Sequence, residues 1–471
     1  MRKTIVATAT LMLSGTIMGT MVPTANAADI TFSGDARARF NYQSNYQDVA
    51  KLTPKNEDQS FWNSRVRLQF QIKTKGGAYA VGRFRLEDGT WDGGTSGHPD
   101  SGTGSPAIAG YPAYNTQAGN RGNIWTDVGY VGLPFAVSQG QQLVLEAGVG
   151  YNDFVSDFLR PSTDNYTFAR VKYATDATTL NVFYEKIREF EVTYSTTTSA
   201  AGVVTQTPVI DGGNNMNDND VDQYGVNLIQ KFNNDWSMNA TVLYRDNQQA
   251  LQLNPDGSTN DGSGFAANAL FSGKANDVGL RAEIAYKQAD YQSINYTSDK
   301  VSTTGDDGYG GYVAAKVPLG AASISAMVGA TFNGFTASHD FGGDRNDNYA
   351  PFVMLSQPST QVTGFLGTGI LVGSTDGNAY FGNIAPSVKV SDQLTLTAEG
   401  TYMSAEYGYG KGGVNGGRFQ GVNTRDIWEV GGIAQYKVSD GATITLLLGY
   451  LDIEDADNNP FGAGLALDLK F

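Results

Sequence analysis

The chain has 471 residues, no cysteine and a formal net charge of −15 at pH 7. The missing cysteines exclude disulfide frameworks, thiolate metal sites and cysteine nucleophiles, and the acidic balance argues against nucleic acid as a partner, because acidic surfaces repel phosphate. The 58 glycines, 25 tyrosines and 23 phenylalanines fit many strands joined by turns.

The N-terminus has the layout of a secretory signal. Arg2 and Lys3 precede an apolar, small-residue run from Thr4 to about Val22, and Ala25-Asn26-Ala27 fits the small-x-small cleavage rule. We predict a signal peptide over residues 1–27 and a mature domain over residues 28–471. A retained membrane anchor is the alternative, although polar residues interrupt the run. No later stretch approaches the roughly 20 apolar residues of a spanning helix.

The first three predicted strands alternate polar and apolar residues. Their polar rows are Asp35, Arg37, Arg39 and Asn41; Arg65, Arg67, Gln69, Gln71 and Lys73; and Arg83, Arg85 and Glu87. An arginine facing lipid near the middle of a bilayer costs roughly 2–4 kcal/mol. Six of them would exceed a typical folding stability of about 5–15 kcal/mol. If the strands cross a membrane, the six arginines must therefore face water inside a barrel.

The same alternation returns along the chain. Apolar rows include Trp236 to Tyr244 and Val278 to Tyr286 in the middle, then Ala442 to Tyr450 and Ala463 to Phe471 at the end. Strands of about ten residues with an apolar outer row match the span of a tilted transmembrane strand. Aromatic residues tend to close these rows, which is typical of an interfacial girdle.

Short turns alternate with long polar connections. Eight turn candidates lie at residues 75–77, 134–140, 175–178, 233–235, 273–277, 318–322, 391–392 and 439–441. The pattern predicts an all-β fold, a transmembrane antiparallel up-and-down β-barrel of 18 strands, with short periplasmic turns and long extracellular loops. Sixteen strands remain possible, because the segments 265–272 and 180–188 have weak patterns.

Two segments carry a resemblance to the bacterial porin superfamily. Val128 to Leu133, followed by a turn and Gln142 to Glu146, resembles the paired strands before the constriction loop, and Leu465 to Phe471 resembles the terminal strand ending in Phe. The resemblance implies an outer-membrane channel for passive diffusion of small hydrophilic solutes and ions. It also implies a homotrimer, contact with outer-membrane lipid and lipopolysaccharide, and recognition of Phe471 by the barrel-assembly machinery.

The chain departs from general porins in three respects. Gly148 to Tyr151 replaces the Gly-Arg-Gln-like end of the fifth strand, and the third outer loop, about residues 150–165, is shorter than usual. Eighteen strands would look more like substrate-specific porins. A substrate-specific channel with a saturable site is therefore one alternative function, and a structural or adhesive barrel is another.

The candidate site lies inside the predicted barrel. We predict a pore-lining basic wall of Arg37, Arg39, Arg65, Arg67, Arg83 and Arg85, with Asp35 and Glu87 as pore-lining acids. By resemblance to porins, the third loop would fold inward and set Asp153 and Asp157 against this wall. Alternatively, the arginines are merely hydrated, and Phe154 and Phe158 pack the loop against the barrel. The overall charge of the chain favours cations, whereas the local charge of the wall favours small anions as well as neutral solutes.

Other kinds of site have little support. His98 and His339, the two histidines, lie in polar loops, which argues against a Ser–His hydrolase and any enzyme of that type. The acidic loops at 211–222 and 340–347 lack the spacing of a calcium-binding motif. The glycine-dense segments 305–311 and 408–417 lack the ending of a phosphate-binding loop. We expect no cofactor and no metal.

Overall fold

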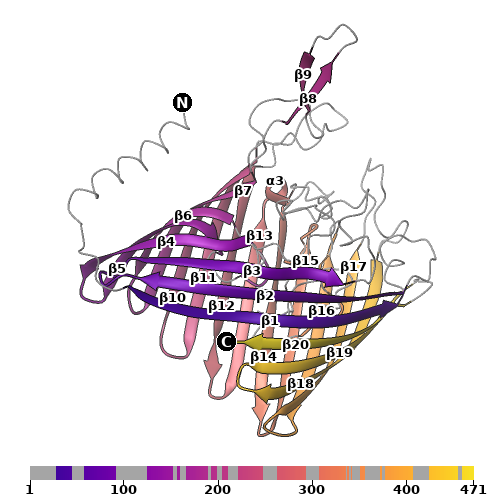
Figure 1. Ribbon diagram of the computed structural model, residues 1–471. Helices are drawn as coiled ribbons and strands as arrows, with labels where there is room; N and C mark the ends of the chain where they lie inside the picture. The colour runs from indigo at the N-terminus through magenta and orange to yellow at the C-terminus, as the bar shows by residue number, and fades with distance from the viewer. Residues whose placement is uncertain are drawn as a thin grey trace.

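The computed structural model (Figure 1) describes residues 28–44, 58–91, 125–151, 156–159, 166–188, 193–198, 204–209, 221–247, 263–292, 307–335, 337–338, 341, 349, 351–355, 372–373, 377–406, 424–454 and 459–471. Eighteen strands form one sheet in which each strand is antiparallel to its neighbours. The pairing of Asp35 with Lys470 through Ser44 with Phe461 joins the first strand to the last and closes the barrel. The prediction of 18 strands is confirmed, and 16 is excluded.

The barrel strands are β1 (Asp29–Ser44), β2 (Gln59–Lys73), β3 (Tyr79–Trp91), β4 (Trp125–Ser138), β5 (Gln141–Gly150), β6 (Tyr166–Ala174), β7 (Thr178–Arg188), β10 (Val221–Lys231), β11 (Trp236–Asn247), β12 (Gly264–Ala275), β13 (Val278–Lys287), β14 (Gly308–Leu319), β15 (Ala322–Phe332), β16 (Ala379–Lys389), β17 (Leu394–Glu406), β18 (Thr424–Ser439), β19 (Ala442–Ile453) and β20 (Phe461–Lys470). The weakly patterned segments at 180–188 and 265–272 are regular strands, β7 and β12.

One end of the barrel carries tight turns, and we call it the short-turn end. Side chains supply part of the turn hydrogen bonding: Asn233 Oδ1 accepts from the N–H groups of Asp235 and Trp236 at 2.8 and 2.9 Å. Gly140 and Gly441 adopt φ values of +74° and +81°, which a side chain would disfavour. Turns lie at all eight predicted places. The predicted turn at 134–140 is shorter than expected, because Pro134 still pairs with Val144 in the β4–β5 ladder.

The outside of the barrel is apolar, and alternate residues point inward. Ile284 is 68% exposed, whereas its neighbours Glu283 and Ala285 are 1% and 5% exposed. Val430 is 63% exposed beside a fully buried Glu429. Because successive strand residues face opposite sides of a sheet, the buried polar set lies inside the closed barrel. This arrangement is the one that the sequence alternation predicts.

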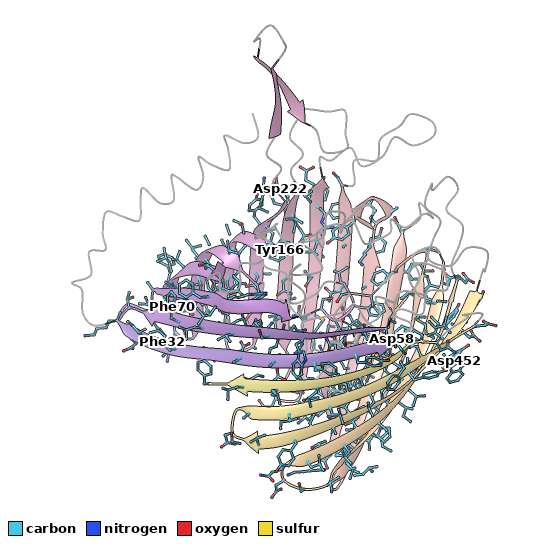
Figure 2. The ribbon with its side chains drawn as sticks, turned by 45° about the vertical axis from the view of Figure 1, so that its right-hand side comes forward. Phe32, Asp58, Phe70, Tyr166, Asp222 and Asp452 are labelled. Atoms are coloured by element: carbon cyan, nitrogen blue, oxygen red, sulfur yellow. The ribbon has the colours of Figure 1, made fainter. Side chains whose placement is uncertain are left out.

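The opposite end, which we call the long-loop end, carries the extended connections. In Figure 2 the labelled side chains of Asp58, Asp222 and Asp452 lie toward this end, and Phe32 and Phe70 lie toward the short-turn end. Rim tyrosines bind two of these aspartates: Tyr42 donates to Asp58 at 3.0 Å, and Tyr184 donates to Asp222 at 2.8 Å. Outward-facing tyrosines thus end the apolar belt where the polar loops begin.

Two elements were not predicted. The connection between β7 and β10 contains a separate two-stranded hairpin of β8 (Thr193–Thr198) and β9 (Val204–Val209), which projects beyond the barrel in Figure 1. A short helix, α3 (Ala289–Gln292), follows β13. Within the described ranges, no helix is long and apolar enough to cross a membrane. The predicted signal peptide, His98 and His339 lie outside the described residues.

Candidate functional site inside the barrel

The six arginines predicted to line the interior lie side by side on three neighbouring strands. The β1–β2 register sets Arg37 opposite Arg65, and the β2–β3 register sets Arg67 opposite Arg85. Arg37 and Arg39 are 7% and 1% exposed, so both are buried in the barrel. We call this set the basic wall; its members are Arg37, Arg39, Arg65, Arg67, Arg83 and Arg85.

Asp35 holds the β2 part of the basic wall. Its Oδ1 atom lies 3.3 Å from Nη2 of Arg65, and its Oδ2 atom lies 2.8 Å from Nη2 of Arg67. Arg67 Nε also donates to Oδ1 at 3.1 Å, so both carboxylate oxygens bind this guanidinium group and the contact is bidentate. Asp35 therefore fixes two guanidinium groups and compensates the charge of only one.

Glu87, the other acid predicted to line the pore, has a different backbone position from the one expected. The β2–β3 register slips between Val66 and Arg67, so Arg85 pairs with Arg67 but Glu87 pairs with Val66. This β-bulge interrupts the strict alternation on which the prediction of Glu87 in the row of Arg85 depended. The side chain of Glu87 lies outside the described residues.

Asp127 of β4, which the sequence analysis did not single out, holds the β3 part of the basic wall. Its Oδ2 atom lies 2.7 Å from Arg83 Nη2 and 2.7 Å from Arg85 Nε. The Arg83 guanidinium also lies over the Tyr151 ring, 4.9 Å from the centroid, and donates to its hydroxyl group. A shared aspartate again compensates one of two arginines.

The basic wall concentrates six guanidinium groups on one side of the interior. A third aspartate, Asp468 of β20, lies 3.9 Å from Arg39. Asp35, Asp127 and Asp468 thus form ion pairs with five of the six arginines. Farther along the barrel, Arg170 of β6 pairs with Glu146 of β5 and adds no net charge. Inside a barrel wall, such fixed charges bias which ions enter.

A segment of the third long connection lies inside the barrel. Ser156, Asp157, Phe158 and Leu159 are at most 5% exposed. The Ser156 hydroxyl donates to Glu283 Oε1 at 2.7 Å, and the N–H groups of Asp157 and Phe158 donate to Glu283 Oε2 at 2.8 and 3.1 Å. Residues 156–159 therefore bind β13 inside the barrel.

The partner of Asp157 differs from the one expected. Asp157 binds Arg281 of β13 through two bonds of 2.5 and 2.7 Å, and Tyr312 of β14 also donates to it. In the closed strand order, β13 lies half-way round the barrel from β2. Asp157 therefore lies across from the basic wall, and Arg281 compensates its charge. Asp153 lies outside the described residues.

A second long connection, between β15 and β16, also enters the barrel. Phe352, Val353, Met354 and Leu355 are fully buried. Glu429 of β18 accepts the N–H groups of Val353, Met354 and Leu355 at 2.5, 2.8 and 2.8 Å. Nothing in the sequence pattern of this connection indicated that it would fold inward.

The two inward segments share one apolar cluster with the barrel wall. Phe158 packs against Phe335 and Phe341 at centroid distances of 5.3 and 4.8 Å. The wall contributes inward apolar side chains on β11 to β19, including Leu243, Met327, Phe381, Met403, Leu447 and Leu451. Apolar contacts thus fasten the segments on the β11–β19 side. The basic wall on β1 to β3 lines the other side of the interior.

Comparisons with known proteins show that several solved structures have a similar architecture. No family model matches the chain, and no curated protein sequence matches it. Among solved structures, Pseudomonas aeruginosa OpdQ is 9% identical with a TM-score of 0.51, and the match covers 94% of this chain and 99% of OpdQ. Acinetobacter baumannii OccAB4 is 10% identical with a TM-score of 0.51, covering 95% of this chain and 100% of OccAB4. The outer membrane protein opdK from Pseudomonas aeruginosa is 11% identical with a TM-score of 0.51, covering 94% and 98%.

The likeness shows the fold. This chain is a closed antiparallel barrel of 18 strands, and the three solved structures share this fold over nearly its whole length. Identities of 9 to 11% carry no substrate or partner from those proteins to this chain.

Proposed function

We propose that the chain is an outer-membrane porin that forms a water-filled channel for small hydrophilic solutes and ions. The observation that carries the proposal is the pairing of an apolar exterior with a charged interior in a closed barrel. Exposed Ile284 and Val430 beside buried Glu283 and Glu429 suit a wall between lipid and water. An 18-stranded barrel is wide enough for an aqueous channel. The proposal contains no catalytic step.

The resemblance to porins also supports a proposed orientation of the barrel in the outer membrane and a set of partners. We propose that the short-turn end faces the periplasm, the long-loop end faces outward, and the protein contacts outer-membrane lipid and lipopolysaccharide. A homotrimer and assembly through the C-terminal Phe471 remain part of the proposal. Phe471 exchanges main-chain hydrogen bonds with Gly34 at 2.7 and 3.0 Å, which supports a structural role for the last residue.

The basic wall supports a preference for anions and neutral solutes. The whole chain carries −15, but charges beyond about 8 Å are largely screened at physiological ionic strength. The six guanidinium groups of the basic wall therefore have more influence on an ion in the bore than remote acidic loops have. A solute with a carboxylate or phosphate would find guanidinium donors along this wall.

Planar-bilayer recording of the purified protein tests the proposal. We expect discrete, ohmic conductance steps that scale with salt concentration. A folded barrel that gives no ion conductance would contradict the porin proposal and favour the structural or adhesive alternative. Folding is checked on the same sample by the heat-dependent shift of its band in gel electrophoresis, so that silence cannot be blamed on denatured protein.

A substrate-specific channel is the second candidate, and the two inward segments favour it. They narrow the interior from the β11–β19 side, so that a passing solute runs along the basic wall. Flux measured in proteoliposomes would saturate with solute concentration for a specific channel. It would rise linearly for a general porin.

A further inference from the structure

Two buried glutamates bind the inward segments in the same way. Glu283 of β13 and Glu429 of β18 are 1% and 0% exposed, and each accepts consecutive main-chain N–H groups of a loop segment. We propose that Glu283 and Glu429 are latches that hold the two loops inside the barrel and thereby set the width of the pore. This inference rests on the proposed channel function.

Glu283 has four donors. Ser156 Oγ and the N–H groups of Asp157 and Phe158 donate from the loop at 2.7 to 3.1 Å. Asn268 Nδ2 of β12 donates from the wall at 2.9 Å and orients the carboxylate. Ser156 Oγ also accepts the N–H of Leu159 at 2.8 Å, which closes the turn of the segment. The glutamate is thus the point where this loop is fixed to the wall.

Glu429 binds its loop segment through main-chain donors, and the buried side chain of Glu399 of β17 lies beside it. The Oε1 atom of Glu429 accepts from Val353 and Met354, and its Oε2 atom accepts from Leu355, at 2.5 to 2.8 Å. All three residues are fully buried, so no water can replace the carboxylate as an acceptor without the segment moving. Three convergent charge-assisted bonds make a strong and specific attachment.

The two glutamates bind mainly main-chain groups of the loops rather than loop side chains. A main-chain N–H is present at every residue except proline. A carboxylate that binds three such groups therefore fixes the position of a loop without requiring particular loop side chains. The loop remains free to present any side chain to the bore, while its distance from the basic wall stays fixed.

The two latched segments also support each other. Ser338, from the same connection as Val353, donates its N–H to the carbonyl oxygen of Phe158 at 3.0 Å. Phe158 packs edge-to-face on Phe341, with centroids 4.8 Å apart, and Phe341 in turn lies 5.8 Å from Phe352. Release of either latch should therefore loosen the other segment, because they share one apolar cluster.

Single-channel conductance of Glu283→Gln and Glu429→Gln tests the proposal. An amide keeps the shape but directs an NH₂ group at main-chain N–H donors that need an acceptor. We expect conductance to rise roughly 1.5- to 2-fold with more open-channel noise, since ion flow grows with the open cross-section. The matched control is Glu185→Gln on β7: Glu185 is also fully buried, and it accepts from the Gln223 side chain at 2.6 Å.

A disulfide supplies the second arm of the test. The chain has no cysteine, and a Cβ built on Gly449 of β19 would lie 2.6 Å from Met354 Cγ, so the two positions are in direct contact. The pair Met354→Cys and Gly449→Cys, oxidised in the Glu429→Gln background, should restore the wild-type conductance. Reduction should raise it again.

The possible outcomes distinguish a failure of the latch proposal from a failure of the proposed channel function. Wild-type channels with unchanged conductance in both glutamine variants would overturn the latches and leave the porin intact. A rise equal to that of Glu185→Gln would also overturn them, because it would show an effect of lost charge alone. A silent wild-type barrel would instead overturn the proposed function itself.

Discussion

Asp157 and Arg281 form a buried, bidentate ion pair that joins a loop to the opposite side of the barrel. The Nε–Oδ2 and Nη2–Oδ1 distances are 2.5 and 2.7 Å, and the side chains of Arg281 and Asp157 are 6% and 0% exposed. The two residues are 124 positions apart in the chain, so the pair fixes a long-range arrangement. It also removes the charge that Asp157 would otherwise present to the basic wall.

Asp157→Asn should loosen the inward segment. Breaking a buried ion pair on one side costs about 3–5 kcal/mol, because the remaining charge is left buried. We expect the barrel to stay folded and its urea midpoint to fall, with the third loop becoming accessible to protease from outside. The double variant Asp157→Leu with Arg281→Met should be less harmful than Asp157→Asn. Equal damage in both would contradict the charge argument.

The paired change Arg65→Gln and Arg67→Gln should lower the preference for anions. It removes two positive charges and leaves Asp35 without the partners that it has at 3.3 and 2.8 Å. The reversal potential in a salt gradient should move toward that of a cation-preferring pore. Lys389→Gln is the control, because its side chain is 56% exposed at the short-turn end and pairs with Asp392 there. An identical shift of the reversal potential in Lys389→Gln would contradict the prediction, because it would show that the effect is not specific to the basic wall.

Gly225→Ala should destabilise the barrel wall. The Phe183 ring of β7 lies on Gly225 of β10, where an added Cβ would overlap it. Displacing a packed ring typically costs about 1–3 kcal/mol. Gly400→Ala is the matched control, because a Cβ there meets nothing within 4 Å. Urea unfolding of the two variants in the same detergent should show a lower midpoint for Gly225→Ala only.

Deleting Phe471 should impair assembly more than stability. Its main chain bonds to Gly34, but its side chain is 62% exposed and makes little core contact. In cells we expect less folded protein in the outer-membrane fraction, because the proposed recognition of Phe471 by the barrel-assembly machinery would be lost. Purified protein refolded into detergent should reach nearly the wild-type yield. A large loss of refolding yield would show that the residue acts through stability instead.

The sequence was sufficient to predict the barrel because polar and apolar residues alternate along its strands with a period of two. This alternation shows which side of the sheet each residue faces. Arg65 and Arg67 share a face with each other and not with Leu68, whatever the neighbouring strands are. Alternation alone does not place Glu87, because a β-bulge adds one residue to β3 between Arg85 and Glu87. The hairpin of β8 and β9 was missed because its threonine-rich strands carry no clear apolar row.

The loop contacts could not be predicted in the same way. Glu283 and Glu429 were visible as polar residues in inward rows, but alternation does not say what a side chain binds across a barrel. Their partners are main-chain groups of segments far away in sequence, such as Phe158 and Met354. Asp127 was overlooked because β4 lacks a clear polar row, although it binds two arginines.

Reversal-potential measurement on single channels in a KCl gradient tests the central claim most directly. The claim is that a hydrated bore passes along the basic wall of Arg37, Arg39, Arg65, Arg67, Arg83 and Arg85. We predict stable conductance steps with a reversal potential of the sign given by chloride preference. A folded barrel without conductance, or a clear preference for potassium that Arg65→Gln with Arg67→Gln leaves unchanged, would contradict the claim.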